Sequence, residues 1–235
     1  MKKANISGKW ALVTGASRGI GREVSIGLAD LGCNVVLHSR TLEGTTALAE
    51  EIRQKGVSVA QVAGELSDQN QVDAILAATF AAVPQIDIVY NNAAVMTPYR
   101  HDWLSFPAED FRASFEVNVI SLIRICLAVI PGMKERGWGR IINVTSGVQN
   151  QPEMTAYAAS KAAVDKFVMD TAGTLAPDGI LMNLLDPGWL RTDLGGPNAP
   201  NSVESVIPGA LVGALYDDGT HGTLIRAQDY AGQIL

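Results

Sequence analysis

Tyr157 and Lys161 are the residues whose types and spacing point most directly to chemistry. They stand four positions apart in the segment YAASK, where the apolar pattern predicts the first turns of a helix that runs to about Leu175. This spacing places both side chains on one helical face, one turn apart. A phenol normally titrates near pH ~10, and a neighbouring ammonium favours the phenolate. We therefore expect Lys161 to lower the pKa of Tyr157 and the pair to move a proton to or from an oxygen atom.

A hydroxyl group precedes this pair. Residues 140–144 predict a buried strand that leads to Thr145 and Ser146. A phenol, an ammonium and a hydroxyl together can protonate or deprotonate an oxygen on a carbon that gains or loses a hydride. Tyr and Lys at this spacing also occur by chance on many helices, with the ring lying along the lysine stem. The catalytic interpretation therefore depends on the segments that precede it.

A glycine-rich turn joins the first predicted strand to a helix. The strand covers residues 9–14, the sequence TGASRGIG covers 14–21, and apolar residues follow at helical spacing to Leu31. Such a turn is the usual context of a dinucleotide phosphate site, because the helix N-terminus meets the pyrophosphate. The spacing is G-x-x-x-G-x-G and not the general G-x-G-x-x-G fingerprint, so the turn alone is weak evidence. Its place after the first strand strengthens the prediction.

The second predicted strand bears on the choice of cofactor. Residues 34–38 form this strand, and Ser39 and Arg40 follow it. Sites that prefer NAD usually carry an acid here for the ribose hydroxyl, and this chain has none. Arg40, together with Arg18 of the glycine turn, offers positive charge to a 2′-phosphate. The alternative is that Arg40 merely begins a solvated loop; we predict NADP(H) in preference to NAD(H).

Strands and helices alternate along the chain. Further strands are predicted at 57–63, 86–90, 140–144, 181–185 and 223–226, and helices at 43–55, 68–83, 107–132 and 157–175, with a short helix ending near 215. This rhythm predicts an α/β protein: a single-domain Rossmann fold over 1–235, with a doubly wound parallel sheet of about seven strands and helices on both faces. Ligands bind beyond the carboxyl ends of such strands. Residues 195–208 are rich in Gly, Pro and Asn, so we expect a mobile substrate loop over about 189–215.

The overall composition narrows the function classes. Hydrophobic residues make up 47% of the 235 residues, and the formal net charge is −6. This composition is typical of a globular protein without the electrostatic footprint of a nucleic-acid partner. Cys33 and Cys126 stand far apart in apolar contexts, which indicates buried free thiols in a reducing compartment and no metal site. Because we find no stretch long enough to span a membrane, we expect a cytoplasmic protein.

Taken together, these motifs resemble the short-chain dehydrogenase/reductase family, in particular its NADP-preferring carbonyl reductases. The resemblance covers residues 9–192 and rests on TGASRGIG at 14–21, NNAA at 91–94, Asn118, Ser146, YAASK at 157–161 and PGWLRT at 187–192. It implies an NADPH-dependent oxidoreductase that transfers a hydride between nicotinamide and a carbonyl or secondary alcohol. It also implies a homodimer or homotetramer formed through the long helices. The alternative function is a non-catalytic NADP(H)-binding sensor or assembly protein on the same fold.

The resemblance assigns roles to individual residues. It implies that Tyr157 is the general acid or base, that Lys161 lowers its pKa and holds the nicotinamide ribose, and that Ser146 binds the substrate oxygen. It also implies that Asn118 is the fourth catalytic residue and holds a water that links Lys161 to solvent; the alternative is a satisfied structural amide. The expected cofactor-binding residues are Gly15, Ser17, Arg18, Gly19, Ile20, Ser39, Arg40, Glu65, Leu66, Asn91, Ala93, Tyr157, Lys161, Pro187, Gly188 and Thr192.

Some positions depart from the family pattern. The segment from Ser146 to Tyr157 is shorter than usual, which leaves Thr145 as an alternative hydroxyl, and Glu65 stands where an aspartate commonly meets the adenine. The substrate pocket is expected to be lined by Val95, Met96, His101, Trp103, Val148, Gln149, Met154, Trp189 and Leu190. This aromatic and aliphatic lining predicts an uncharged, moderately apolar carbonyl or alcohol as the small-molecule substrate. Several of these residues could instead pack a lid or a subunit interface.

Overall fold

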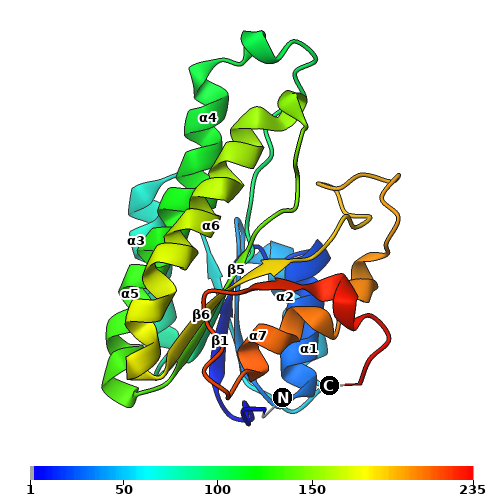
Figure 1. Cartoon of the computed structure of the whole chain (residues 1–235). Coiled ribbons are helices and arrows are strands. Elements are labelled where there is room, and N and C mark those ends of the chain that lie inside the picture. Colours follow the sequence, from blue (N-terminus) through cyan, green and yellow to red (C-terminus); the bar gives the residue numbers. More distant parts are fainter. Residues whose placement is uncertain (1–2, 235) are drawn as a thin grey trace.

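A parallel seven-stranded sheet forms the centre of the computed structural model, which describes residues 3–234 (Figure 1). The strands are β1 (Trp10–Val13), β2 (Asn34–Ser39), β3 (Val59–Ala63), β4 (Ile88–Asn91), β5 (Gly139–Val144), β6 (Ile180–Asp186) and β7 (Leu224–Arg226). Their order is β3-β2-β1-β4-β5-β6-β7, and every neighbouring pair is parallel. The chain therefore winds outward from β1 in both directions, which confirms the predicted single-domain Rossmann fold.

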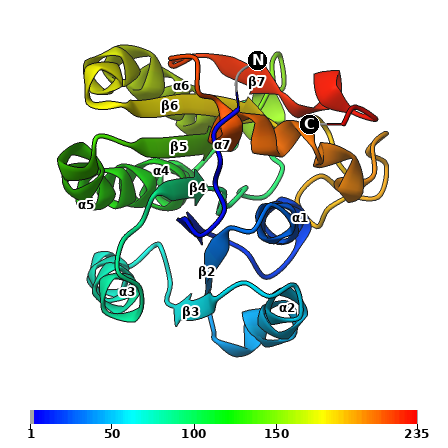
Figure 2. The same cartoon turned by 90° about the horizontal axis from the view of Figure 1, so that it is seen from below.

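Helices cover both faces of this sheet (Figure 2). One face carries α1 (Gly19–Asp30), α2 (Glu43–Arg53) and α7 (Val212–Leu215). The other carries α3 (Gln69–Ala82), α4 (Ala108–Phe115), α5 (Ser121–Arg136) and α6 (Thr155–Leu175). Each face has its own hydrophobic core, and the central strands are apolar on both sides because both are covered.

The segment predicted as one helix over residues 107–132 is longer and less regular than expected. It consists of α4, a π-helical turn at Glu116–Ile120 and α5, which continues to Arg136 and ends at left-handed Gly137 (φ 64°). The π turn contains Asn118, whose side chain is buried and fully engaged with neighbouring residues. Apolar periodicity did not reveal the extra residue that a π turn inserts.

This helical run also corrects the expectation that no stretch is long enough to span a membrane. Residues Ala108–Arg136 form 29 helical residues with a mean hydropathy of 1.9 over the most apolar window, so by length and composition alone the run could cross a membrane. Half of that window is buried inside the protein. Buried residues of α5, among them Ile125 and Met133, pack into the core beneath the sheet. The helix is thus explained as a core helix.

The second half of the expected substrate loop is packed against the sheet. Within the segment 189–215, Val206, Ala210 and Leu211 are buried in the core on the α1 face. The hydroxyl of Tyr90 on β4 donates a hydrogen bond to the carbonyl oxygen of Ala210 at 2.8 Å. Only the first part, up to about residue 202, lies as an irregular loop beyond the strand ends (Figure 1).

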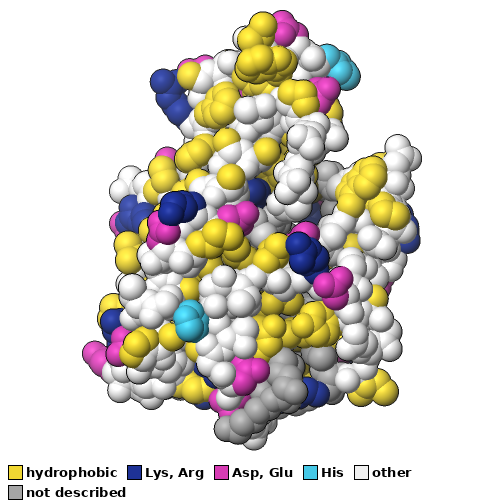
Figure 3. All heavy atoms as spheres, viewed as in Figure 1, with side chains coloured by type: hydrophobic (Ala, Val, Ile, Leu, Met, Phe, Trp, Pro, Cys, Tyr) yellow, Lys and Arg dark blue, Asp and Glu magenta, His cyan; other side chains and the backbone are white. Residues whose placement is uncertain are grey.

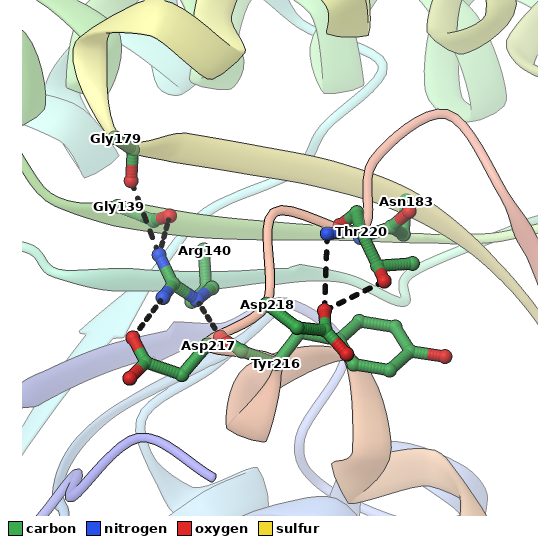
Figure 4. Close-up of polar contacts among 8 residues, drawn as sticks. All are labelled: Gly139, Arg140, Gly179, Asn183, Tyr216, Asp217, Asp218 and Thr220. Carbon is green, nitrogen blue, oxygen red and sulfur yellow. Dashed lines mark hydrogen bonds and ion pairs between the residues drawn. The ribbon is translucent and has the colours of Figure 1, made fainter. Parts of the chain in front are cut away.

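A buried arginine closes the opposite edge of the sheet (Figure 4). The Arg140 guanidinium donates hydrogen bonds to the carbonyl oxygens of Tyr216 (2.8 Å), Gly139 (2.8 Å) and Gly179 (3.1 Å). It also lies 3.6 Å from the carboxylate of Asp217. These contacts tie the start of β5 to the segment that leads into β7.

Candidate active site

The glycine turn lies at the carboxyl edge of the sheet and has little room for side chains. Gly15 has a φ of +65°, and a Cβ there would lie 3.0 Å from the Cα of Ala93. A Cβ at Gly21 would lie 2.4 Å from the carbonyl oxygen of Gly15. Glycine is therefore required at both positions, since a left-handed backbone and such close approaches exclude other residues. Gly19, with a φ of +57°, faces Thr192 across the turn.

The N-terminus of α1 is free to meet an anion. Arg18 occupies the N-cap position with an extended backbone, and no side chain caps the helix. The first N–H groups of a twelve-residue helix thus point out of the glycine turn without a side-chain partner. This open helix end and the glycine-lined turn fit the pyrophosphate of a dinucleotide. Ser17 and Ile20, two further predicted cofactor residues, belong to the same turn.

Asn92 braces the turn, a role that the sequence reasoning missed. Its side-chain amide donates to the carbonyl oxygens of Thr14 (2.9 Å) and Gly15 (3.2 Å). The Thr14 hydroxyl in return accepts the backbone N–H groups of Asn92 (3.0 Å) and Ala93 (3.1 Å). The repeated asparagine after β4 was the available signal, but only its first member was assigned a role. The second asparagine holds the turn in shape.

His38 supports the turn from the neighbouring strand. Its Nδ1 accepts the N–H of Gly15 at 3.3 Å, and its Nε2 lies 3.1 Å from the carbonyl oxygen of Gly64. These partners require the proton on Nε2 and a neutral ring. Burial lowers the pKa of His38, and this effect outweighs the carbonyl of Gly64 and the charge of Glu65, which raise it. The ring therefore acts as a neutral strut between β2, the glycine turn and the end of β3.

The residues expected to bind the 2′-phosphate, Arg40, Ser39 and Arg18, differ in exposure and in their partners. Arg40 is exposed, but the Ser39 hydroxyl is buried and donates to the carbonyl oxygen of Thr41 at 2.5 Å. The Arg18 guanidinium forms an ion pair with Asp193 at 2.9 Å, and both side chains are largely exposed. Arg18 thus links the glycine turn to the loop after β6, a contact that the sequence did not predict.

Two other predicted cofactor residues turn their side chains inward. The Asn91 amide donates to Asn143 (2.9 Å) and to the Cys126 sulfur (3.2 Å) inside the core. The Leu66 side chain is buried in the core beneath α3. Both residues can therefore meet a cofactor only through their backbone. Glu65, Ala93 and Gly188 are half-buried at the strand ends, and Pro187 is buried beside Gly188.

Three of the four predicted catalytic residues, Ser146, Tyr157 and Lys161, meet beyond the end of β5. The Tyr157 side chain is buried with 6% exposure, and its hydroxyl lies near Ser146, whose side chain lowers the pKa of the phenol. The Lys161 ammonium lies 5.8 Å from the centre of the Tyr157 ring and donates to the carbonyl oxygen of Val144 at 2.8 Å. Figure 1 shows α6 rising past the strand ends, which places its first turns beside this edge.

The protonation of this group differs from the expectation. Burial raises the pKa of Tyr157, and so does the Asp186 carboxylate, whereas only the hydrogen bond with Ser146 lowers it. Burial also lowers the pKa of Lys161 to about 8, against the opposing charge of Asp165. The expected net lowering of the Tyr157 pKa is not seen in this structure, where burial raises that pKa.

The neighbouring hydroxyls have separate partners. Thr145, the alternative to Ser146, is buried and donates to the Asp165 carboxylate at 2.5 Å. Ser146 is half-buried, and its oxygen accepts the N–H of Val148 at 3.3 Å. Of the two hydroxyls, Ser146 is thus the one that faces Tyr157. The shortened segment before Tyr157 does not remove it from the site.

Asn118 joins the π turn to the loop after β4. Its side-chain oxygen accepts the N–H of Val95 at 2.8 Å, and its amide donates to the Val95 carbonyl and the Ser160 hydroxyl, both at 2.9 Å. Ser160 in turn donates to the carbonyl oxygen of Tyr157 at 2.7 Å. Asn118 is thus a satisfied amide that connects the loop after β4 to α6.

Two cavities border the site. One of about 330 Å³ is lined by Val148, Gln149, Asn150, Gln151, Pro152, Thr155, Ala158 and Ala159. The other, of about 290 Å³, is lined by Thr145, Ser146, Gly147, Gln149, Asp165, Asp186, Leu224 and Arg226. Among the residues that the structure describes, Val148 and Gln149 are the only predicted substrate residues that line either of these two cavities.

The other predicted substrate residues line neither of these two cavities. Trp103 and Trp189 are exposed by 55% and 58%, and His101 is exposed near Trp103. Figure 3 shows hydrophobic side chains gathered at the top of the molecule, over the segment that precedes α4. Met96 and Met154 are half-buried, but Leu190 is buried in the core and does not line a pocket.

Comparisons with known proteins bear on the whole chain. The family model of the short chain dehydrogenases matches residues 9–202. The 7alpha-hydroxysteroid dehydrogenase of Escherichia coli is 32% identical over 190 residues, which are 80% of this chain and 73% of that enzyme. A 3-oxoacyl-[acyl-carrier-protein] reductase of Pseudomonas aeruginosa is 35% identical over 195 residues, which are 81% of this chain and 77% of that enzyme.

Solved structures of related enzymes share the fold closely. A 3-oxoacyl reductase of Agrobacterium tumefaciens with NADP bound has a TM-score of 0.85 at 28% identity, and the match covers 94% of this chain and 93% of that one. A 7 alpha-hydroxysteroid dehydrogenase in complex with NADH and 7-oxo glycochenodeoxycholic acid has a TM-score of 0.86 at 27% identity, covering 98% and 97%.

The chain therefore belongs to the short-chain dehydrogenase/reductase family. It is an NAD(P)-dependent oxidoreductase of the kind that acts on CH–OH and C=O groups. The alternative of a non-catalytic sensor or assembly protein is not favoured, because the relatives described above are enzymes.

Proposed function

We propose that this protein is an NADPH-dependent carbonyl reductase in which Tyr157 is the general acid. The observation that carries the proposal is the buried Tyr157, whose hydroxyl lies near Ser146 and whose ring lies 5.8 Å from the Lys161 ammonium. The cofactor, when bound, supplies or accepts the hydride. In the opposite direction, alcohol oxidation, Tyr157 would serve as the base.

Each residue contributes a distinct step to this reaction. A substrate carbonyl oxygen that accepts hydrogen bonds from Ser146 and Tyr157 would be held between two donors. Tyr157 would then pass its proton to that oxygen as negative charge develops there. Lys161 would stabilise the phenolate that remains, since its ammonium lies beside the ring. Asn118 would keep these groups in register through Ser160 and the backbone of Tyr157.

The protonation states favour reduction over oxidation. Because burial raises the pKa of Tyr157, the phenol keeps its proton at neutral pH and is ready to donate it. A base for alcohol oxidation would need the deprotonated form. At neutral pH, Tyr157 is therefore in the form that carbonyl reduction requires.

The proposed preference for NADP(H) rests on charge. Arg40 is exposed at the end of β2, where NAD-preferring sites usually carry an acid, and Arg18 lies in the glycine turn. The related structures include one with NADP and one with NADH, so they do not decide between the two cofactors. The proposed preference therefore rests on this chain's own residues. The proposed contacts of Pro187, Gly188 and Thr192 with the nicotinamide follow from their place after β6.

The proposed substrate is a small, uncharged and moderately apolar carbonyl compound. Val148, Ala158 and Ala159 give the larger cavity an apolar lining near Ser146. Met96, His101, Trp103, Met154 and Trp189 would approach such a substrate only if their loops close over the site. We also propose a cytoplasmic location, supported by the two buried free cysteines and tested by cell fractionation.

The test is a fluorescence titration with NADPH and NADH, followed by a panel of aldehydes and ketones monitored through cofactor absorbance. Tighter binding of NADPH together with turnover of one or more carbonyl compounds would support the proposal. NADPH binding without turnover on any member of a broad panel would contradict a general carbonyl reductase. Failure to bind either cofactor would overturn the assignment of the glycine turn.

A further inference from the structure

Two side chains of α6 hold the end of β5. The Lys161 ammonium donates to the carbonyl oxygen of Val144 at 2.8 Å. The Thr145 hydroxyl donates to Oδ1 of Asp165 at 2.5 Å. Lys161 and Asp165 stand at i and i+4, so they project from one face of the helix. One helical face thus binds two successive residues of the strand end.

The next residue of the chain is Ser146. Thr145 is buried, and its backbone N–H donates to the carbonyl oxygen of Leu185 on β6 at 2.8 Å. The strand end is therefore fixed through its backbone to β6 and through its side chain to α6. Ser146 leaves the strand directly after this fixed residue. The position of Thr145 consequently sets the direction in which the Ser146 hydroxyl points.

We propose that Asp165 is a positioning residue of the active site: it fixes Thr145, directs Ser146 at the reacting oxygen, and holds a negative charge one turn beyond Lys161. Asp165 acts through these neighbours and does not itself touch the reacting atoms. The proposal rests on the proposed reductase function and adds to it a residue outside the Tyr157–Lys161–Ser146 group.

The charges around Asp165 support this role. Lys161 lies on the same helix as Asp165, and Asp186 approaches Asp165 from the end of β6. The Asp186 carboxylate also raises the pKa of Tyr157. Burial raises the pKa of Asp165, whereas the Thr145 hydroxyl and Lys161 lower it. The Asp165 carboxylate raises the pKa of Lys161, whereas burial lowers it. Removing this charge would make Lys161 lose its proton more readily.

The surroundings of Asp165 make substitutions there practicable. It borders the cavity of about 290 Å³, whose lining includes Gln149, Asp186 and Arg226. A neutral or smaller side chain at this position would face a polar cavity and would not leave a hole in the hydrophobic core. We therefore expect Asp165 variants to fold.

The first test addresses the hydrogen bond. Thr145→Val removes the hydroxyl but keeps the size of the side chain, and should lower kcat about 100-fold, because misplaced groups in a site cost about that much. Thr145→Ser restores the hydroxyl and should keep kcat within about threefold of the wild type. NADPH affinity should stay the same in both variants. A wild-type kcat in Thr145→Val would refute the proposal.

The second test addresses the charge. Asp165→Asn keeps an oxygen that can accept the Thr145 hydroxyl but removes the negative charge. The pH above which reduction is lost should fall by about one unit, since a nearby opposite charge shifts a pKa by at least that much. Asp165→Ala should add the loss of kcat seen in Thr145→Val. An unmoved pH profile in Asp165→Asn would overturn the electrostatic part of the proposal.

The matched control is Asp170→Asn. Asp170 lies on the same helix but pairs with Lys166 on the surface, so its neutralisation should change neither kcat nor the pH profile. Thermal unfolding of all variants separates misplacement from misfolding. Wild-type protein that reduces no carbonyl compound would refute the proposed function itself, whereas active wild type with unaffected variants would refute only the role of Asp165.

Discussion

Burial governs the protonation of the residues that are proposed to face the reacting oxygen. The Tyr157 phenol and the Lys161 ammonium both sit in a low-dielectric environment that disfavours their charged forms. The phenol therefore stays protonated, while the ammonium becomes the group that titrates nearest to neutral pH. The protonated phenol suits carbonyl reduction, whereas loss of the Lys161 proton would limit it.

A pH dependence follows from these two shifts. The pKa of Lys161 is lowered from 10.5 to about 8, so its ammonium is lost as the pH rises through about 8. Tyr157 still keeps its proton there, because its pKa is raised above 10.0. We expect kcat/KM for carbonyl reduction to be constant below pH 8 and to fall above it. A rate that persists undiminished to pH 10.0 would show that the ammonium is not required.

The ion pair between Arg18 and Asp193 affects cofactor choice. Asp193 occupies the guanidinium that a 2′-phosphate would use, and an exposed pair of this kind is worth about 1 kcal/mol or less. We expect Asp193→Asn to strengthen NADPH binding up to about fivefold, the equivalent of that energy, and to leave NADH binding nearly unchanged. Fluorescence titration measures both. The control Asp178→Asn, which removes the same charge from a surface pair with Lys134, should change neither affinity.

At the scale of elements, apolar patterns predicted most strands and helices, because Gly, Pro or polar residues mark the ends of each element. The segments 34–38 and 86–90 correspond to β2 and β4, and the predicted helix 68–83 corresponds to α3, which the Asp68 side chain caps. The π turn was not predictable, since it adds one residue without changing the apolar pattern. The short helix predicted to end near residue 215 corresponds to α7, but the substrate loop expected over about 189–215 was drawn too long, because Val206, Ala210 and Leu211 pack in the core.

The site was predicted only in part for a related reason. The rule that ligands lie beyond the carboxyl ends of parallel strands places the glycine turn, Ser146 and Tyr157 at one edge. It does not place side chains that meet across the fold. The bonds of Asn92 to the glycine turn and of Thr145 to Asp165 depend on how helices pack on strands. Desolvation of Tyr157 likewise arises only from the assembled fold.

The opposite edge of the sheet allows a prediction about stability. Arg140 is 2% exposed and supplies three carbonyl oxygens with donors (Figure 4). We expect Arg140→Met to lower the free energy of unfolding by about 3–5 kcal/mol, the usual cost of removing one partner from a buried polar network. Urea unfolding measures this. The exposed Arg112, changed to Met, should cost less than about 1 kcal/mol, and an equally small effect at Arg140 would contradict the account.

At the scale of the whole molecule, we propose that copies of this chain associate through the exposed face formed by α5 and α6. Leu127 on α5 and Met169 on α6 each expose 62% of their surface, although the protein carries a net charge of −6. We expect a homodimer or homotetramer for the wild type, and a smaller mass for the variant with Leu127→Glu and Met169→Glu, because charge opposes burial of that face. Light scattering after size exclusion measures the mass. Phe80→Glu on α3 is the control, and a monomeric wild type would refute the proposal.

Comparison of Tyr157→Phe with the wild type is the measurement that tests the central claim most directly. Both proteins should be titrated with NADPH and then assayed for reduction of a carbonyl substrate of the wild type. The phenylalanine keeps the ring but removes the proton donor, so we expect kcat to fall by at least about 100-fold, a typical contribution of general acid catalysis. NADPH affinity should change less than about threefold, because the glycine turn is untouched. Turnover equal to that of the wild type would show that Tyr157 is not the acid.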